Sequence, residues 1–267
     1  MTKTVLITGI SSGFGKVIAE QLAASGYNVY GFSRKQKEDL TGKIKVLQAD
    51  VTDVSSIKKG IDTLIAQEGK LDILINNAGM GISGSIEDSS TEAIRLQMET
   101  NFMGYVNMIQ AVLPTMRNQK SGTIVNISSI GGLMGLPYQG FYAASKFAVE
   151  GLSESLRMEL KPFKIKIVVI QPGDFLTSFT ANRQPEKSST GAYQEQFNKT
   201  LALIEKDEKG GLKPEYLAKK LAKILEKKNP CHSYIIATLE QKFAVVLKRI
   251  LPGSLFSAIL SDHYGIK

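Results

Sequence analysis

Residues 5–15 read Val5-Leu6-Ile7-Thr8-Gly9-Ile10-Ser11-Ser12-Gly13-Phe14-Gly15. The first three residues suit a buried strand, the glycines suit a turn, and apolar residues at helical spacing follow from Val17 to Ala23. A strand, a glycine-rich turn and a helix in this order can bind a pyrophosphate, because glycine lets the backbone approach the phosphates and the helix N-terminus offers unpaired amides. The glycine spacing is G-x-x-x-G-x-G rather than G-x-G-x-x-G, so a tight structural turn is the alternative interpretation.

Outward from this stretch, segments typical of strands and helices alternate along the chain. Strands are predicted at 27–32, 44–47, 71–75, 123–127, 165–170 and 234–236, and helices at 55–68, 91–116, 142–160 and 214–228. Such alternation predicts an α/β fold, a doubly wound parallel sheet with helices on both faces. Because no internal repeat or linker divides the chain, residues 1–267 are expected to form a single Rossmann domain.

Two segments depart from this alternation. Residues from about 174 to 212 are mostly polar and small, and we expect a loop region beside the substrate. The tail from about 243 to 264 is apolar on one face and is interrupted by Pro252-Gly253. Such tails usually pack into a core or a subunit interface. Next to basic helices, a peripheral membrane contact is the alternative.

Composition limits the classes of protein. The single cysteine, Cys231, excludes an internal disulfide, and no apolar run approaches the roughly twenty residues that cross a bilayer. With no signal-peptide pattern at its start, the chain is expected to be cytoplasmic, with a membrane-peripheral location as the alternative. The net charge of +8 most simply marks a solvated surface, and aromatic residues do not interleave with the lysines, which disfavours nucleic acid. His232 and His263 lack partners at metal-ligand spacing, so no metal is predicted.

The residues after the second predicted strand distinguish the two nicotinamide dinucleotides. An NAD site carries an acid there to bond the ribose hydroxyls. This chain has Ser33-Arg34-Lys35 instead, and two cations with a hydroxyl suit a 2′-phosphate that a carboxylate would repel. The sequence therefore favours NADP(H), with surface charges in a turn as the alternative.

Tyr142-Ala143-Ala144-Ser145-Lys146 opens another predicted helix. Tyr142 and Lys146 lie on one face, four residues apart, and a neighbouring ammonium lowers the pKa of a phenol from its usual ~10. Such a tyrosine can give a proton to a carbonyl or take one from an alcohol. Alone, a pair like this is more often a solvated helix face.

Together these motifs resemble the short-chain dehydrogenase/reductase family, in its compact single-domain branch. Similar segments are the glycine turn, Asn76-Asn77-Ala78-Gly79 and Pro172-Gly173 with Thr177, and the likeness covers about residues 3–177. The tail at 247–252 is similar to members named 17β-hydroxysteroid-dehydrogenase-like or acyl-dihydroxyacetone-phosphate-reductase-like. The resemblance implies about seven strands in the order 3-2-1-4-5-6-7 and an NADP-dependent enzyme acting on CH-OH donors. It also implies a homo-oligomer, a dimer or a tetramer.

The resemblance also implies a catalytic tetrad of Asn101, Ser129, Tyr142 and Lys146. Tyr142 would exchange the proton, Ser129 would hydrogen-bond the substrate oxygen, and Lys146 would lower the pKa of Tyr142 and hold the nicotinamide ribose. Asn101 would hold a water between Lys146 and solvent. The alternatives are a helix kink at Asn101, a turn hydroxyl at Ser129 and a capping carboxylate at Asp50. The expected cofactor-binding residues are Gly9, Ser11, Ser12, Gly13, Phe14, Gly15, Ser33, Arg34, Lys35, Asp50, Val51, Asn77, Ala78, Gly79, Tyr142, Lys146, Pro172, Gly173, Phe175 and Thr177.

Mostly apolar residues near the tetrad are expected to line the substrate pocket, namely Ser129, Met134, Leu136, Tyr138 and Phe179. Such a wall favours a lipid-like or steroid-like carbonyl over a sugar. Two other functions stay open. The net charge would suit the anionic carriers of a β-ketoacyl thioester reductase. A non-catalytic NADP(H)-binding redox sensor would have no need of Tyr142 together with Lys146.

Overall fold

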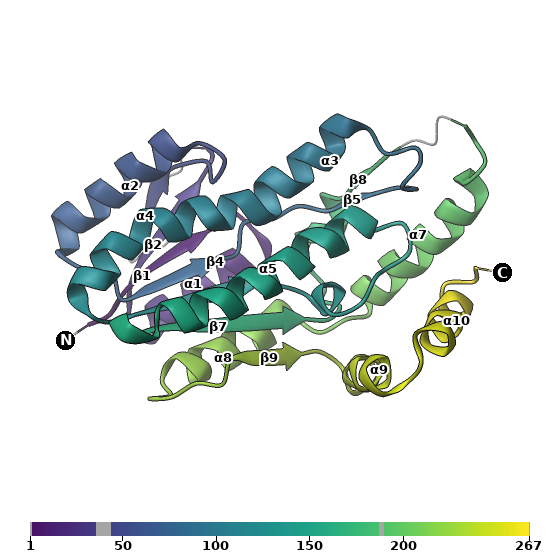
Figure 1. Ribbon diagram of the computed structural model, residues 1–267. Helices are drawn as coiled ribbons and strands as arrows, with labels where there is room; N and C mark the ends of the chain where they lie inside the picture. The colour runs from purple at the N-terminus through teal and green to yellow at the C-terminus, as the bar shows by residue number, and fades with distance from the viewer. Residues whose placement is uncertain (1, 36–43, 187–189, 267) are drawn as a thin grey trace.

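The computed structural model describes residues 2–35, 44–186 and 190–266, and seven parallel strands form the centre of this part of the chain (Figure 1). The strands are β1 (Thr4–Thr8), β2 (Asn28–Ser33), β3 (Ile44–Gln48), β4 (Ile73–Asn76), β6 (Gly122–Ile127), β7 (Ile165–Pro172) and β9 (Ser233–Ile236). They pair in the order β3-β2-β1-β4-β6-β7-β9, so the predicted order is confirmed when only the strands of this sheet are counted. A separate two-stranded sheet joins β5 (Ile82–Ser83) to β8 (Gln184–Pro185).

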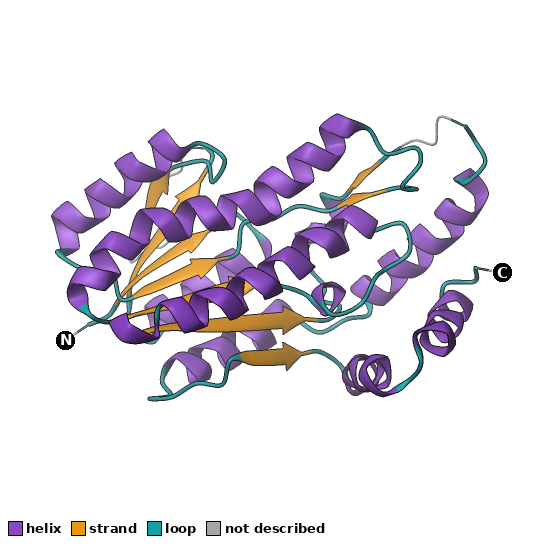
Figure 2. Ribbon diagram, in the orientation of Figure 1, coloured by secondary structure: helices purple, strands orange, loops and turns teal. Residues whose placement is uncertain are grey.

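Helices cover both faces of the large sheet, as Figure 2 shows. Alternate side chains of a strand point to opposite faces, so Val5 and Ile7 pack in one core cluster and Leu6 in another. The helices of the first cluster are α1 (Gly13–Ala24) and α8 (Pro214–Leu225), and those of the second are α2 (Val54–Glu68), α4 (Gly104–Gln119) and α5 (Gly140–Glu159). Burial on both faces explains why the strands are almost continuously apolar.

The long helix predicted at 91–116 is interrupted in the structure. It consists of α3 (Thr91–Met98), a π-helical turn (Glu99–Met103) and α4. The fully buried Asn101 lies in the π-helical turn, and its side chain both accepts from and donates to the backbone of Met80, at 2.8 and 2.9 Å. The wider turn lets Asn101 bond to a distant segment, a role that π-helical turns often have at functional sites. The helix is thus interrupted at Asn101, the position at which the sequence allows a cap or a kink.

The region predicted as a loop at 174–212 contains helix. A short α6 (Ser178–Ala181) is followed by α7 (Gln194–Lys209), whose Phe197 and Ile204 are buried. This part of the loop prediction was wrong, because apolar residues at helical spacing were outweighed by the polar residues around them. After residue 212, α8 and β9 complete the sheet as predicted.

The apolar tail forms two helices beyond the carboxyl ends of the strands (Figure 1). Helix α9 (Leu239–Ile250) begins with a capping box between Thr238 and Gln241, and α10 (Gly253–His263) follows the helix-breaking Pro252. Among the described residues, none of the helices has the length and hydropathy needed to cross a membrane.

Candidate active site

A cleft of about 830 Å³ opens where the strands of the large sheet end. Its lining runs from the glycine turn after β1, past the ends of β4, β6 and β7, to α7, α9 and α10. The carboxyl ends of parallel strands are where doubly wound folds bind their ligands, because the loops there diverge to opposite faces. The cleft is therefore both nucleotide-sized and continuous with the tail of the chain.

The glycine turn has the close packing that a pyrophosphate cradle needs. Gly9 and Gly13 have φ angles of +71° and +55°, which only glycine adopts without strain. A Cβ on Gly15 would lie 2.2 Å from the carbonyl oxygen of Gly9, so a side chain cannot fit there. Asn77 fixes the turn through its side-chain amide, which donates to the carbonyl oxygens of Thr8 and Gly9 at 2.9 and 3.2 Å. These features fit a dinucleotide.

The ribose-phosphate end is hydroxylic and cationic. Ser11 and Ser33 share a hydrogen bond of 2.9 Å, and the exposed Arg34 lines the cleft beside them. Lys35 is exposed but does not line the cleft. Asp50 lines the cleft and accepts from the backbone and hydroxyl of Thr52. The capping carboxylate of α2 is Asp53, so the capping interpretation of Asp50 was wrong, and its contact with the cofactor stays a prediction.

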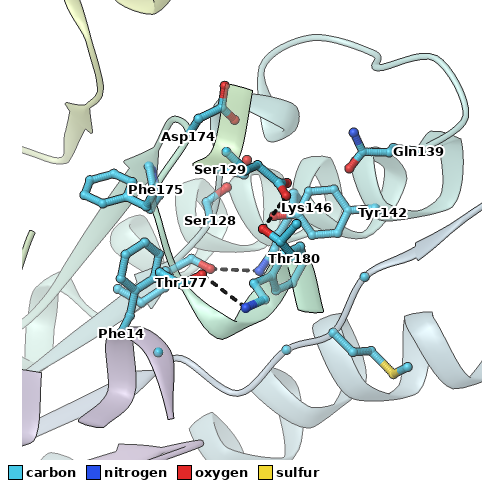
Figure 3. Close-up of a pocket in the computed structure, with 18 of the residues that line it drawn as sticks. Phe14, Ser128, Ser129, Gln139, Tyr142, Lys146, Asp174, Phe175, Thr177 and Thr180 are labelled. Carbon is cyan, nitrogen blue, oxygen red and sulfur yellow. Dashed lines mark hydrogen bonds between the residues drawn. The ribbon is translucent and has the colours of Figure 1, made fainter. Parts of the chain in front are cut away.

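Phe175 lies in the segment that resembles the nicotinamide-binding segment of the family. Its ring packs edge-on against Phe14, with 4.9 Å between the centroids, and both rings line the cleft (Figure 3). Gly13, Gly173 and Thr177 line the same wall. Phe175 therefore serves as packing that joins the glycine turn to the end of β7.

Tyr142, Ser129 and Lys146 converge on the floor of the cleft (Figure 3). Ser129 caps a short 3₁₀ turn after β6, where its Oγ accepts from the backbone of Gly131 at 3.0 Å. Lys146 is buried, and its Nζ donates to the carbonyl oxygen of Ile127 at 2.9 Å. Helix α5 is bonded to the chain of β6 at a second point, since its Ser153 accepts from the buried Asn126 of β6 at 2.9 Å.

The pKa values of Tyr142 and Lys146 differ from those expected from the sequence. Burial raises the pKa of Tyr142 to about 12, although a hydrogen bond with Ser129 lowers it in part. Burial lowers the pKa of Lys146 to about 8, and the carboxylate of Glu150 opposes that change. The pKa of Tyr142 is therefore raised rather than lowered as expected, because the loss of water favours the neutral form of each group.

Asn101 does not line the cleft. Besides holding Met80, its side-chain amide donates to Ser145 Oγ at 3.2 Å, and that hydroxyl donates to the carbonyl oxygen of Tyr142 at 2.7 Å. The side chain thus connects the π-helical turn to the helix that contains Tyr142 and Lys146. The predicted water contact of Asn101 stays a prediction.

The apolar part of the predicted substrate pocket is largely in place. Met134, Leu136 and Phe179 line the cleft, and the Phe179 ring lies 5.7 Å from the Tyr142 ring. Tyr138 was predicted in this set wrongly. Its backbone has a φ of +57°, and its ring packs 5.5 Å from Phe197 of α7, outside the main cleft.

Charged residues that lie near Tyr142 were missed from the sequence. The carboxylates of Asp174, Asp207 and Glu208 line this end of the cleft, where Glu208 pairs with the buried Arg183 and Asp207 lies 3.3 Å from His263. Burial and the neighbouring carboxylates of Glu208 and Asp207 raise the pKa of Asp174 to about 6. This end of the cleft is acidic in a chain whose net charge is +8.

These acids do not form a metal site. Within the described ranges, no group of three His, Cys, Asp or Glu side chains has an arrangement that could hold a metal ion.

Known proteins share both the sequence pattern and the fold of this chain. The family model described as short chain dehydrogenase matches residues 3–188. The chain is 46% identical, over 98% of both sequences, to a 3-ketodihydrosphingosine reductase from Bacteroides thetaiotaomicron. A crystal structure of a short-chain dehydrogenase from Streptomyces avermitilis superposes with a TM-score of 0.84 at 29% identity, covering 100% of this chain and 97% of that one. The structure of ElxO with NADP bound gives 0.73 at 28% identity, covering 88% and 97%.

Proposed function

Because the chain belongs to the short-chain dehydrogenase family of oxidoreductases, we propose that it reduces the ketone of a long-chain lipid with NADPH. The observation that carries this proposal is the convergence of Ser129, Tyr142 and Lys146 in one cleft with the glycine turn. An apolar wall of Met134 and Phe179 adjoins them. A redox sensor would have no use for this convergence.

The residues present suit NADP(H). Gly9, Gly13 and the start of α1 would hold the pyrophosphate, while Arg34 and Ser33 would hold the 2′-phosphate. Lys146 would hold the nicotinamide ribose, as the family resemblance implies. When bound, the nicotinamide supplies the hydride, and the protein supplies position and proton management. The NADP bound in ElxO supports this choice.

The chain's own residues would manage the proton. With a pKa raised to about 12, Tyr142 is protonated at neutral pH and can donate its phenolic proton to the carbonyl oxygen as negative charge develops there. Ser129 would hydrogen-bond the same oxygen. The ammonium of Lys146 would then stabilise the phenolate that remains. Lys146 is fixed for this role by its bond to the carbonyl oxygen of Ile127, to which the buried Tyr105 also donates at 3.0 Å.

The substrate class follows from the lining of the cleft. We favour a long-chain ketone that carries an amino group beside the carbonyl, the chemistry of 3-ketodihydrosphingosine. The apolar wall suits the alkyl chain, and the carboxylate of Asp174 suits an ammonium close to Tyr142, whereas Glu208 is already paired with Arg183. The carboxylate of Asp174 would repel the anionic carrier of a β-ketoacyl thioester, which makes the thioester reductase the weaker alternative.

A substrate comparison tests the proposal. Initial rates of NADPH oxidation would be measured with 3-ketodihydrosphingosine, with its N-acetyl derivative, and with a β-ketoacyl thioester. We expect the free amine to be the best substrate and the uncharged amide to be weaker by about tenfold or more, since hydrogen bonds to charged groups contribute ~1.5–3 kcal/mol. A preference for the thioester would contradict the proposal. Tight NADPH binding without turnover of any ketone would favour the sensor.

The predicted homo-oligomer stays a prediction. The helices that contain Asn101 and Tyr142 carry exposed apolar side chains, Met103, Phe147 and Met158, which would suit the pairing that the family resemblance implies.

A further inference from the structure

Helices α9 and α10 both carry exposed apolar side chains. Leu239, Phe243, Val246 and Ile250 are 83%, 60%, 49% and 68% exposed. Their spacing of four, three and four residues places them along one stripe of the helix. The residues that we call the tail surface are Leu239, Phe243, Val246, Ile250, Leu255 and Ile259.

The tail surface lies between the cleft and a pair of cations. On α9, at 3.6 residues per turn, Leu247 is rotated ~70° from the centre of the stripe to one side, and Lys242 and Arg249 are rotated ~70–90° to the other. Leu247 lines the cleft. On α10, Ile259 is both 45% exposed and part of the cleft lining, so it marks the place where the tail surface meets the cleft.

We propose that the tail surface docks on an anionic phospholipid bilayer and brings the mouth of the cleft to the lipid–water interface. An exposed apolar stripe with cations along one side is what an interfacial helix needs, because apolar burial and attraction to anionic headgroups add together. The inference rests on the proposed function, since a long-chain ketone resides in a bilayer and reaches the cleft by the shortest path from its surface.

A second copy of the chain is the competing occupant of this face. The helices around Asn101 and Tyr142 already offer Met103, Phe147 and Met158 for pairing, and these side chains lie on other helices than the tail surface. Lys242 and Arg249 would also meet like charges in a symmetric contact of this face, whereas anionic lipid complements them.

The experiment is vesicle flotation of the full chain without substrate. Vesicles of phosphatidylcholine alone would be compared with vesicles that also contain phosphatidylglycerol. The double variant Phe243→Glu/Ile250→Glu changes two exposed residues outside the cleft lining, and Val54→Glu, at a position 60% exposed on α2, is the matched control. We expect the wild type and Val54→Glu to float with anionic vesicles and the double variant to bind at least about tenfold more weakly. The variant Lys242→Gln/Arg249→Gln should weaken binding to the vesicles that contain phosphatidylglycerol and leave binding to pure phosphatidylcholine unchanged.

Equal flotation of the wild type and the double variant would overturn the inference. So would a double variant that loses only self-association in size-exclusion chromatography without lipid, because the face would then be an interface between copies. Flotation tests membrane docking alone, because it is measured without substrate. Turnover of a short, water-soluble amino ketone tests the proposed function alone, and the double variant should retain it.

Discussion

The carboxylate of Glu150 raises the pKa of the buried Lys146 and so helps to keep its ammonium charged. Glu150 lies one turn after Lys146 on α5, and its Oε2 accepts from Gln171 of β7 at 3.0 Å. The Cβ atoms of residues four apart on a helix are ~6 Å apart, and two unit charges at that separation attract each other by about 3 kcal/mol at an effective dielectric constant of ~20. Glu150→Gln is therefore expected to lower the pKa of Lys146 by about two units, from about 8 to roughly 6.

The consequence is a shift in the pH dependence of turnover. Lys146 is a base whose pKa is depressed in the folded state, so its ammonium is present below that pKa and is lost as the pH rises through it. The alkaline limb of kcat should therefore move from near pH 8 in the wild type to roughly pH 6 in Glu150→Gln. At pH 7 the variant should retain about a tenth of the wild-type kcat.

Initial rates of NADPH oxidation at saturating ketone, measured between about pH 5 and pH 9, would resolve the alkaline limb of the wild type from that of Glu150→Gln. Glu154→Gln is the matched control, since it removes an exposed carboxylate one turn further along α5. Glu150→Asp keeps a carboxylate at this position, so its alkaline limb should lie between those of the wild type and Glu150→Gln. A Glu150→Gln enzyme that folds normally and keeps the wild-type alkaline limb would show that Glu150 does not sustain the charge of Lys146.

Three further variants test other parts of the cleft. Arg34→Ala should raise the KM for NADPH about tenfold and leave that for NADH within about twofold, and equal losses in steady-state kinetics with both nucleotides would contradict the 2′-phosphate assignment. Asp174→Asn should raise the KM for the amino ketone about tenfold with little change for its N-acetyl derivative. In the wild type that KM should rise as the pH falls through about 6, where the carboxylate becomes neutral; a pH-independent KM would count against this role. Gly15→Ala should lower the free energy of unfolding by about 1–3 kcal/mol in thermal denaturation, whereas Gly135→Ala, with nothing within 4 Å of its added Cβ, should not.

The parts of the fold that depend on local chemistry could be predicted from the sequence. The strand, glycine turn and helix at the N-terminus follow from side-chain periodicity and from the backbone freedom of Gly9 and Gly13. The order of the strands came from the family resemblance rather than from any local pattern, and it is confirmed. The family resemblance also allowed Ser129, Tyr142 and Lys146 to be assigned to one site.

The parts that depend on distant contacts could not be predicted. The π-helical turn at Asn101 is held by Met80, more than twenty residues earlier, and no periodicity signals such a contact. The acidic end of the cleft joins Asp174, from the end of β7, to Asp207 and Glu208 of α7. The helical spacing of Phe197 and Ile204 could have indicated α7, but its place beside Tyr142 follows only from tertiary packing.

We propose that Tyr142 is the proton donor of an NADPH-dependent lipid ketone reductase. The most direct measurement is kcat/KM for 3-ketodihydrosphingosine with the wild type and with Tyr142→Phe, together with the Kd of each protein for NADPH. We expect turnover to fall by about 10²–10⁴-fold in the variant while NADPH binding stays near that of the wild type. A Tyr142→Phe protein that keeps most of its activity would contradict the proposal.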